Sequence, residues 1–151
     1  MIVVLDLDQT LIYCTPCKTG LIKLPNDENY QIQCRPYLGE FLDWVSYNYE
    51  VQIWSAGTKE YVERVCLYLN DRFEFKPCRI RTREEMVPFE GRMVKLLTES
   101  TMFIVDDNHR YIAQNKQWIP ILPWEGQSSD RELLRIESVL KSRWLSALTL
   151  L

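Results

Sequence analysis

The sequence predicts an α/β fold, in which a parallel β-sheet carries helices on both faces. Three observations lead to this prediction. Ile2–Leu5 and Met102–Val105 are continuous apolar runs rich in β-branched residues, the pattern of strands that are buried on both faces of a sheet. Segments with helical spacing of apolar residues alternate with the strand segments, as βαβ crossovers require. Both apolar runs end in aspartates, and ligand sites of Rossmann-like sheets lie beyond the carboxyl ends of the strands.

Length and composition indicate one globular domain over residues 1–151. The chain is 46% apolar and 12% aromatic, which is enough to form a single core. Its 18 basic and 21 acidic residues give a net charge of −3, which argues against direct binding of nucleic acid through its phosphates. The sequence has neither an apolar run that could span a membrane nor a secretion signal before the first strand. We therefore expect an intracellular protein, nuclear or cytoplasmic and not secreted, with five free thiols.

The N-terminal half predicts a flap and two strand–helix units. Two strand-like segments flank the turn-rich residues 25–29 and predict a β-hairpin, which we expect to project as a flap over about residues 18–34. An amphipathic helix begins near Pro36, and a strand follows over Val51–Trp54. A second helix begins with Thr58 as its N-cap. The residues expected to face the core are Leu38, Phe41, Leu42 and Val45 in the first helix and Val62, Val65, Cys66 and Leu69 in the second.

The C-terminal half predicts two further strands and a last helix. Arg79–Arg83 alternates as a strand does, whereas the state of residues 84–100 stays open. Trp118–Leu122 predicts an edge strand, because its central proline cannot donate a hydrogen bond. Ser129–Glu132 has the pattern of a capping box that opens the last helix. The apolar residues 144–151 allow packing on the core or on a second copy, so monomer and homodimer both stay open. The core positions expected in this helix are Leu133, Ile136, Leu140 and Trp144.

The carboxylates at the strand ends predict a phosphate-handling metal site. Asp6 and Asp8 follow the first strand and Asp106–Asp107 follow the other apolar strand, so up to four carboxylates converge at one edge of the sheet. Such a cluster suits a hard cation, Mg²⁺ above all. A carboxylate beside the ion can attack phosphorus and form an aspartyl-phosphate, while a neighbouring acid protonates the leaving oxygen and then activates water. Ser55 and Lys95 supply a hydroxyl and a cation for the phosphoryl oxygens.

Four motifs resemble, in order, those of the haloacid dehalogenase superfamily of aspartate-based phosphotransferases. They are Asp6–Thr10, Ile53–Ser55, Lys95 and Val105–Asp107. Within this superfamily the chain resembles a minimal, stand-alone member of the small phosphatases of the RNA polymerase II C-terminal domain, also called NLI-interacting-factor-like phosphatases. The segments that carry this closer resemblance are Arg35–Tyr37, Phe41–Leu42, Trp54–Gly57 and Tyr61. The resemblance extends from Ile2 to about residue 145, nearly the whole chain.

The resemblance assigns roles to individual residues. It implies that Asp6 is the nucleophile, that Asp8 is the general acid and base, and that Thr10 supports their loop. Ser55 and Lys95 would bind the phosphate.

The resemblance also implies a metal site. Mg²⁺ would be held by the Asp6 carboxylate, the main-chain carbonyl of Asp8 and Asp107, with Asp106 orienting Lys95 or a metal-bound water. Asp107 stands where these phosphatases usually have asparagine, which adds a negative charge beside the ion. Only ten residues separate Lys95 from Asp106, so we expect a helix of the parent fold to be trimmed here.

The spacing of the motifs bears on the substrate. The 24 residues between the first motif and Arg35, and the 39 between Ser55 and Lys95, leave no room for a separate lid domain, so we expect a capless, open site. An open site favours a phosphate carried on a protein or peptide. The resemblance implies phosphoserine or phosphothreonine of the RNA polymerase II C-terminal domain type, contacted by the flap and by Arg83.

Alternatives stay open at this point. A docking module with weak or no catalysis, like the mitochondrial translocase relatives of this family, would use the same surface. A capless phosphatase of small phosphomonoesters would use the same chemistry. Arg79, Arg81 and Arg83 would share one strand face, either as a solvated face with ion pairs or as a track for a phosphopeptide. Cys14 and Cys17 leave a redox role open, since no second pair at metal-ligand spacing accompanies them.

Overall fold

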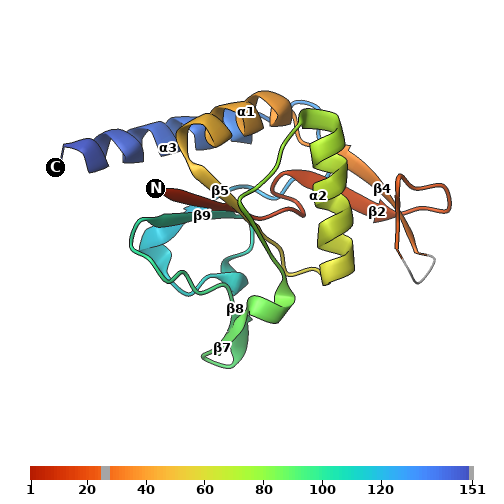
Figure 1. The fold of residues 1–151 in the computed structure, drawn as a ribbon, viewed down its shortest axis with the longest axis horizontal. Helices are drawn as coiled ribbons and strands as arrows, with labels where there is room; N and C mark the ends of the chain where they lie inside the picture. The colour runs from red at the N-terminus through yellow and green to blue at the C-terminus, as the bar shows by residue number, and fades with distance from the viewer. Residues whose placement is uncertain (25–27, 150–151) are drawn as a thin grey trace.

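Residues 1–24 and 28–149, which the computed structural model describes, contain a five-stranded sheet in the order β10-β9-β1-β5-β6 (Figure 1). Every neighbouring pair of strands in it is parallel. The strands are β1 (Ile2–Leu5), β5 (Glu50–Trp54), β6 (Arg79–Arg81), β9 (Met102–Asp106) and β10 (Trp118–Pro120). The predicted α/β class with a parallel sheet is therefore confirmed, with β1 at the centre and the proline-containing β10 at an edge.

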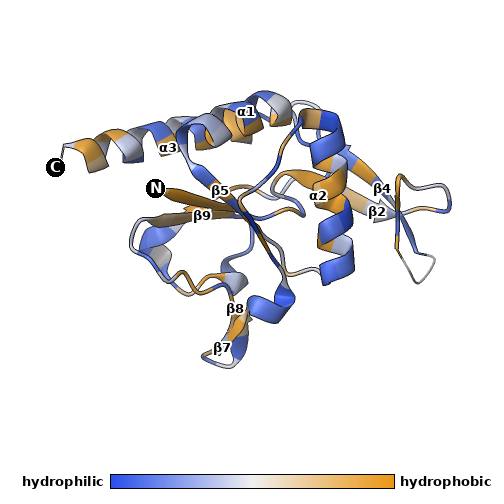
Figure 2. Cartoon of the chain, in the orientation of Figure 1, coloured by the Kyte–Doolittle hydropathy of each residue, from blue (hydrophilic) through white to orange (hydrophobic). Residues whose placement is uncertain are grey.

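The three α-helices of the described residues pack on one face of this sheet. They are α1 (Leu38–Asn48), α2 (Lys59–Phe73) and α3 (Glu132–Leu148). Alternate residues of β1 separate the two faces: Val3 and Leu5 lie in the hydrophobic cluster with these helices, whereas Val4 lies in a second cluster. Figure 1 shows α1 and α3 side by side, and Figure 2 shows β1 and β9 as apolar along their length. Apolar side chains on both faces are typical of strands that are covered on both sides.

The second face differs from the prediction of helices on both faces, because short segments, in place of α-helices, cover it. They include the 3₁₀ helices η1 (Arg83–Glu85), η2 (His109–Tyr111) and η3 (Asn115–Gln117) and the hairpin of β7 (Val87–Phe89) and β8 (Arg92–Val94). Met86 and Leu97 pack with Trp54 in the cluster on this side. The ten residues between Lys95 and Asp106 form no α-helix, because most of them are needed for the turn and for β9. The second layer is therefore thinner than the first.

A small antiparallel sheet, which we call the flap sheet, projects beyond the main sheet (Figure 1). It consists of β2 (Ile12–Pro16), β4 (Asn29–Cys34) and β3 (Ile22–Lys23), in that spatial order. The predicted hairpin corresponds to β3 and β4, while residues 25–27 of its predicted loop lie outside the described residues. The sequence does not predict β2, because its residues show no clear alternation of apolar and polar side chains. Most of these side chains are half-buried in the structure. The flap sheet therefore begins at Ile12, close behind the first aspartate motif, and not near residue 18.

The arginine-rich strand differs from the prediction. β6 ends at Arg81, and Arg83 belongs to η1, so the three arginines do not share one strand face. Arg81 is buried with its guanidinium carbon 3.5 Å from the centre of the Trp54 ring. Arg79 and Arg81 both pair with Glu85. The prediction of one strand face shared by the three arginines is therefore wrong, so no such face is available as a phosphopeptide track.

The start of α3 also differs. The prediction of a capping box on Ser129–Glu132 is wrong, because Asp130 Oδ2 accepts the hydrogen bond from the Glu132 backbone N–H at 3.2 Å. Asp130 takes this position because Arg35 holds its carboxylate by an ion pair of 2.7 Å. The predicted core residues Leu133, Ile136 and Leu140 are buried. Trp144 is 39% exposed, contrary to the prediction, because α3 continues past the sheet (Figure 1).

Other local predictions are confirmed. α2 begins directly after its predicted cap Thr58, and α1 begins at Leu38, two residues after Pro36. All five cysteines are free. In the two stretches that the structure describes, no helix has both the length and the apolar character that crossing a bilayer needs.

Candidate active site

A cleft of about 240 Å³ opens at the carboxyl ends of β1, β5 and β9. It is lined by Asp6, Asp8, Gln9, Ser55, Ala56, Gly57, Asp107, Asn108 and Tyr111. These residues belong to the loops that follow the three strands, and parallel pairing brings those loops to one edge of the sheet. The cleft therefore lies where the sequence predicts the ligand site.

Three carboxylates meet beside this cleft. Asp6, Asp106 and Asp107, which we call the acidic cluster, each offer one oxygen, and these oxygens lie within 4.8 Å of one another. Lys95, from the segment after β8, places its Nζ 3.0 Å from Asp6 Oδ1 and 2.6 Å from Asp106 Oδ2. The Lys95 side chain is completely buried. The structure thus brings together four of the residues singled out from the sequence.

Thr10 links the acidic cluster to the loop after β1. Its Oγ1 lies 3.1 Å from Asp6 Oδ2 and 3.1 Å from Asp107 Oδ1, so one buried hydroxyl bridges two carboxylates. The loop folds back on itself, because the Thr10 backbone N–H donates to the Leu7 carbonyl, and Gln9 takes a left-handed conformation with φ 62. This geometry suits a residue that supports the loop.

Asp8 is not part of the acidic cluster. Its Oδ1 accepts a hydrogen bond of 2.5 Å from the Tyr61 hydroxyl, which comes from the first turns of α2. Burial, with the charge of Asp6, raises the pKa of Asp8 to about 6. Sequence reasoning gave Tyr61 no role in the chemistry, although Tyr61 was one of the residues that carried the family resemblance.

Ser55 and Arg83 lie at another side of the cleft. Ser55 is buried at the end of β5, and its Oγ accepts a hydrogen bond of 3.0 Å from the Gly57 backbone N–H. A Cβ atom at Gly57 would lie 2.9 Å from the Tyr61 ring, so only glycine fits there. Arg83 is exposed, and its Nε donates to the Ala56 carbonyl at 3.1 Å, which holds it beside the rim.

Burial and mutual repulsion determine the charges of the site. Burial and the charge of Asp6 raise the pKa values of Asp106 and Asp107 above the usual carboxyl range. Burial opposes the charge of Lys95, but Asp6 and Asp106 outweigh this effect and raise the pKa of Lys95. Asp106 has both oxygens occupied, by Lys95 and by the Asn108 backbone N–H at 2.9 Å. One ammonium cannot balance three carboxylates, and the oxygens of Asp6 and Asp107 therefore fit a hard cation such as Mg²⁺.

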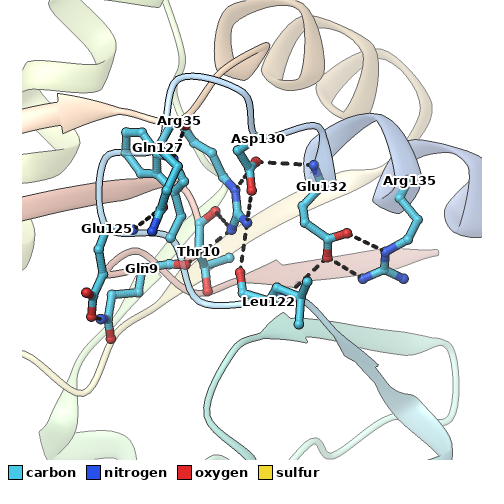
Figure 3. A network of polar contacts seen from close by, with 10 residues as sticks. Gln9, Thr10, Arg35, Leu122, Glu125, Gln127, Asp130, Glu132 and Arg135 are labelled. Carbon is cyan, nitrogen blue, oxygen red and sulfur yellow. Dashed lines mark hydrogen bonds and ion pairs between the residues drawn. The ribbon is translucent and has the colours of Figure 1, made fainter.

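Arg35 binds the far side of the loop after β1 (Figure 3). Its buried guanidinium donates to the carbonyls of Gln9 (3.2 Å), Thr10 (3.0 Å) and Leu122 (2.7 Å). Its Nε and Nη2 also bind the two oxygens of Asp130, at 2.7 and 2.9 Å. All the donor groups of this side chain are thus used to join the loop to the start of α3. Sequence reasoning gave Arg35 no role, although it lies in a segment that carried the family resemblance.

A parallel α/β sheet whose first strand ends in two aspartates, facing a lysine and a second aspartate pair, defines a protein of the haloacid dehalogenase type. The chain belongs to the NLI interacting factor-like phosphatase family, whose family model matches residues 1–147.

Individual relatives agree with this membership. The chain is 32% identical to the CTD small phosphatase-like protein 3 of Caenorhabditis elegans over 152 residues, which cover 92% of this chain and 53% of the relative. It is 28% identical to the putative CTD phosphatase-like protein 355R of Invertebrate iridescent virus 6, with 90% and 94% covered. The solved structure of Fcp1, an essential RNA polymerase II CTD phosphatase, has the same fold, with a TM-score of 0.66 at 22% identity over 98% of this chain and 48% of that one. The chain thus spans about half the length of the nematode relative.

Proposed function

We propose that this chain is a magnesium-dependent phosphatase that removes phosphate from phosphoserine or phosphothreonine of a protein or peptide, with Asp6 as its nucleophile. The observation that carries the proposal is the meeting of the acidic cluster with the buried Lys95 beside an open cleft. Family membership supports hydrolysis of a phosphate ester. The CTD phosphatase-like names of the two relatives, together with the description of Fcp1 as an RNA polymerase II CTD phosphatase, support a substrate of the RNA polymerase II C-terminal domain type.

The reaction begins at Asp6. Lys95 and Thr10 hold its two oxygens, so the carboxylate is fixed in place before the substrate arrives. One oxygen attacks phosphorus and the bond to the seryl oxygen breaks, which leaves a phosphoaspartate on Asp6. When bound, Mg²⁺ would be held by the Asp6 and Asp107 carboxylates and the Asp8 main-chain carbonyl, and it would offset the negative charge of the phosphate.

Asp8 carries the protons. Its pKa of about 6, raised chiefly by burial, lets it hold a proton close to neutral pH. It gives this proton to the seryl oxygen as the phosphorus–oxygen bond breaks. The carboxylate then takes a proton from water, whose oxygen attacks phosphorus and releases inorganic phosphate and free Asp6.

Lys95 and Ser55 provide donors for the phosphoryl oxygens. Among the described residues, two of the three Lys95 N–H groups go to Asp6 and Asp106, which leaves the third for the phosphate. Ser55 Oγ accepts from the Gly57 N–H, so its own hydroxyl proton is available to a phosphoryl oxygen. Both donors are buried and fixed, which favours transition-state stabilisation.

The shape of the cleft supports a substrate carried on a larger chain. A cleft of about 240 Å³ without a covering domain in the described residues has room for a phosphate and its side chain, but it does not enclose a metabolite. The exposed Arg83 beside the rim and the neighbouring flap sheet would contact the chain on which the phosphate is carried.

Turnover of a phosphopeptide panel, with and without Mg²⁺, tests the proposal. Asp6→Asn should abolish turnover while the melting temperature holds or rises, since the amide cannot attack phosphorus but relieves repulsion in the acidic cluster. Asp43→Asn, at an exposed position of α1, is the matched control and should keep full activity. Turnover by the Asp6→Asn variant would contradict the nucleophile. Turnover of small aryl phosphates alone would favour the small-molecule alternative, and no turnover of either class would favour a docking module.

A further inference from the structure

Tyr61 is fixed on several sides near the cleft. Its backbone N–H donates to the Thr58 side chain that caps α2, at 3.4 Å. Its ring lies edge-on to Tyr30, with centroids 5.4 Å apart, and lies close to Gly57. Its hydroxyl also contacts the Cys14 thiol of β2. A tyrosine held in this way presents its O–H in a fixed direction.

That O–H is aimed at one oxygen of Asp8. The distance from the Tyr61 hydroxyl to Asp8 Oδ1 is 2.5 Å, and this hydrogen bond joins α2 to the loop after β1. In the described part of the chain, no side chain other than Tyr61 donates a hydrogen bond to the Asp8 carboxylate, and Asp8 lines the cleft. The carboxyl group can rotate about its last bond, so a single contact decides which oxygen is free.

We propose that Tyr61 is a positioning residue, which holds Asp8 Oδ1 so that Oδ2 is the oxygen that exchanges a proton with the leaving group and with water. This inference rests on the proposed function, because it requires Asp8 as the acid and base. The Tyr61 proton is engaged in the hydrogen bond that its hydroxyl donates to Asp8 Oδ1, so it is not the proton that is transferred. The proton that reaches the leaving oxygen therefore comes from Asp8 Oδ2 as the phosphorus–oxygen bond breaks. Without the Tyr61 hydroxyl, the Asp8 carboxyl group would adopt several orientations, and only some of them would place its proton within reach of the leaving oxygen.

The dependence of the rate on the leaving group tests this role. Phenyl phosphate releases a phenol with a pKa of about 10, which needs a proton, whereas p-nitrophenolate leaves without one. The two substrates have nearly the same shape, so differences in binding cancel. Tyr61→Phe, which keeps the ring, should lower kcat for phenyl phosphate by about tenfold more than for p-nitrophenyl phosphate, with KM nearly unchanged. Tyr68→Phe is the matched control, since Tyr68 lies two turns further along α2 and contacts Cys34 and Arg72.

Asp8→Asn, measured in parallel, separates the inference from the proposed function. It should show the same selectivity to a greater degree, and Tyr68→Phe should show none. If Tyr61→Phe slows both substrates equally, or neither, while Asp8→Asn stays selective, the positioning role is wrong. If Asp8→Asn is not selective, Asp8 is not the acid, and the proton-transfer step of the proposed function is wrong. A crystal structure of Tyr61→Phe provides a second readout: Asp8 should occupy more than one rotamer, and one unchanged rotamer would overturn the inference.

Discussion

Replacing Arg35 by methionine should destabilise the fold far more than replacing an exposed arginine. The Arg35 side chain is 0% exposed, and its loss removes two donors from the Asp130 carboxylate and one donor from each of three backbone carbonyls. The Gln9 carbonyl keeps the Trp124 backbone N–H as a donor. Removing one partner of a buried ion pair costs about 3–5 kcal/mol. The Asp130 side chain is 13% exposed and keeps the hydrogen bond from the Glu132 N–H, so water can solvate part of the unpaired carboxylate. We therefore expect a loss of unfolding free energy at the lower end of this range, about 3 kcal/mol. For a chain of this size that corresponds to a fall in melting temperature of about 6–12 °C.

Arg135→Met is the matched control. Arg135 pairs with Glu132, but its side chain is 46% exposed, and such a pair is worth about 0–1 kcal/mol. Thermal unfolding followed by circular dichroism measures both variants. Equal melting temperatures for Arg35→Met and Arg135→Met would refute the reasoning. A double variant of Arg35→Met with Asp130→Asn should lose less than the sum of the two single changes, because no unpaired charge remains; simple additivity would show that the two side chains are not coupled.

Three further predictions concern the site. In metal-free protein the pKa values of Asp8, Asp106 and Asp107 lie above those of the unfolded chain, so the folded state binds protons more tightly. The melting temperature should therefore fall as pH rises from about 5 to about 7.5. Added Mg²⁺ should flatten this dependence, and a melting temperature that rises over this range would contradict the charges assigned here. Gln9→Glu would place a carboxylate where the Gln9 amide now donates to Glu125 Oε1 at 2.7 Å. The repulsion should lower the urea midpoint of unfolding by an amount worth less than about 1 kcal/mol, and adding Glu125→Gln should restore the midpoint. Arg83→Ala should reduce kcat/KM on a phosphoserine peptide about tenfold and leave a small aryl phosphate nearly unchanged, whereas Arg79→Ala should affect neither; an equal loss on both substrates would remove Arg83 from peptide binding.

The main sheet and the place of the site could be predicted because both depend on local patterns. β1 and β9 are apolar on both faces, which distinguishes buried parallel strands from other segments. Asp6 and Asp107 follow those strands directly, and parallel pairing alone brings their side chains to the same edge. Two features of the chain and one topological rule were therefore enough to locate the cleft.

Contacts between distant segments could not be predicted in the same way. Tyr61 is 53 residues from Asp8, and whether the two touch depends on where α2 lies over the loop after β1. Arg35 and Asp130 are 95 residues apart, and their pairing moved the cap of α3 away from Ser129. The second face of the sheet is covered by short 3₁₀ helices whose residues carry no periodic pattern. Each of these features is set by tertiary packing and leaves no local signal in the sequence.

The central claim is that Asp6 receives the phosphate, and trapping its phosphorylated form tests this most directly. Beryllium fluoride with Mg²⁺ forms a stable mimic of a phosphorylated aspartate, and a crystal structure of the protein soaked in both shows which side chain carries it. The account predicts a tetrahedral adduct on an Asp6 carboxylate oxygen, within hydrogen-bonding reach of Lys95 Nζ and Ser55 Oγ. An adduct on Asp8, Asp106 or Asp107, or none on Asp6 under conditions that support turnover, would contradict it.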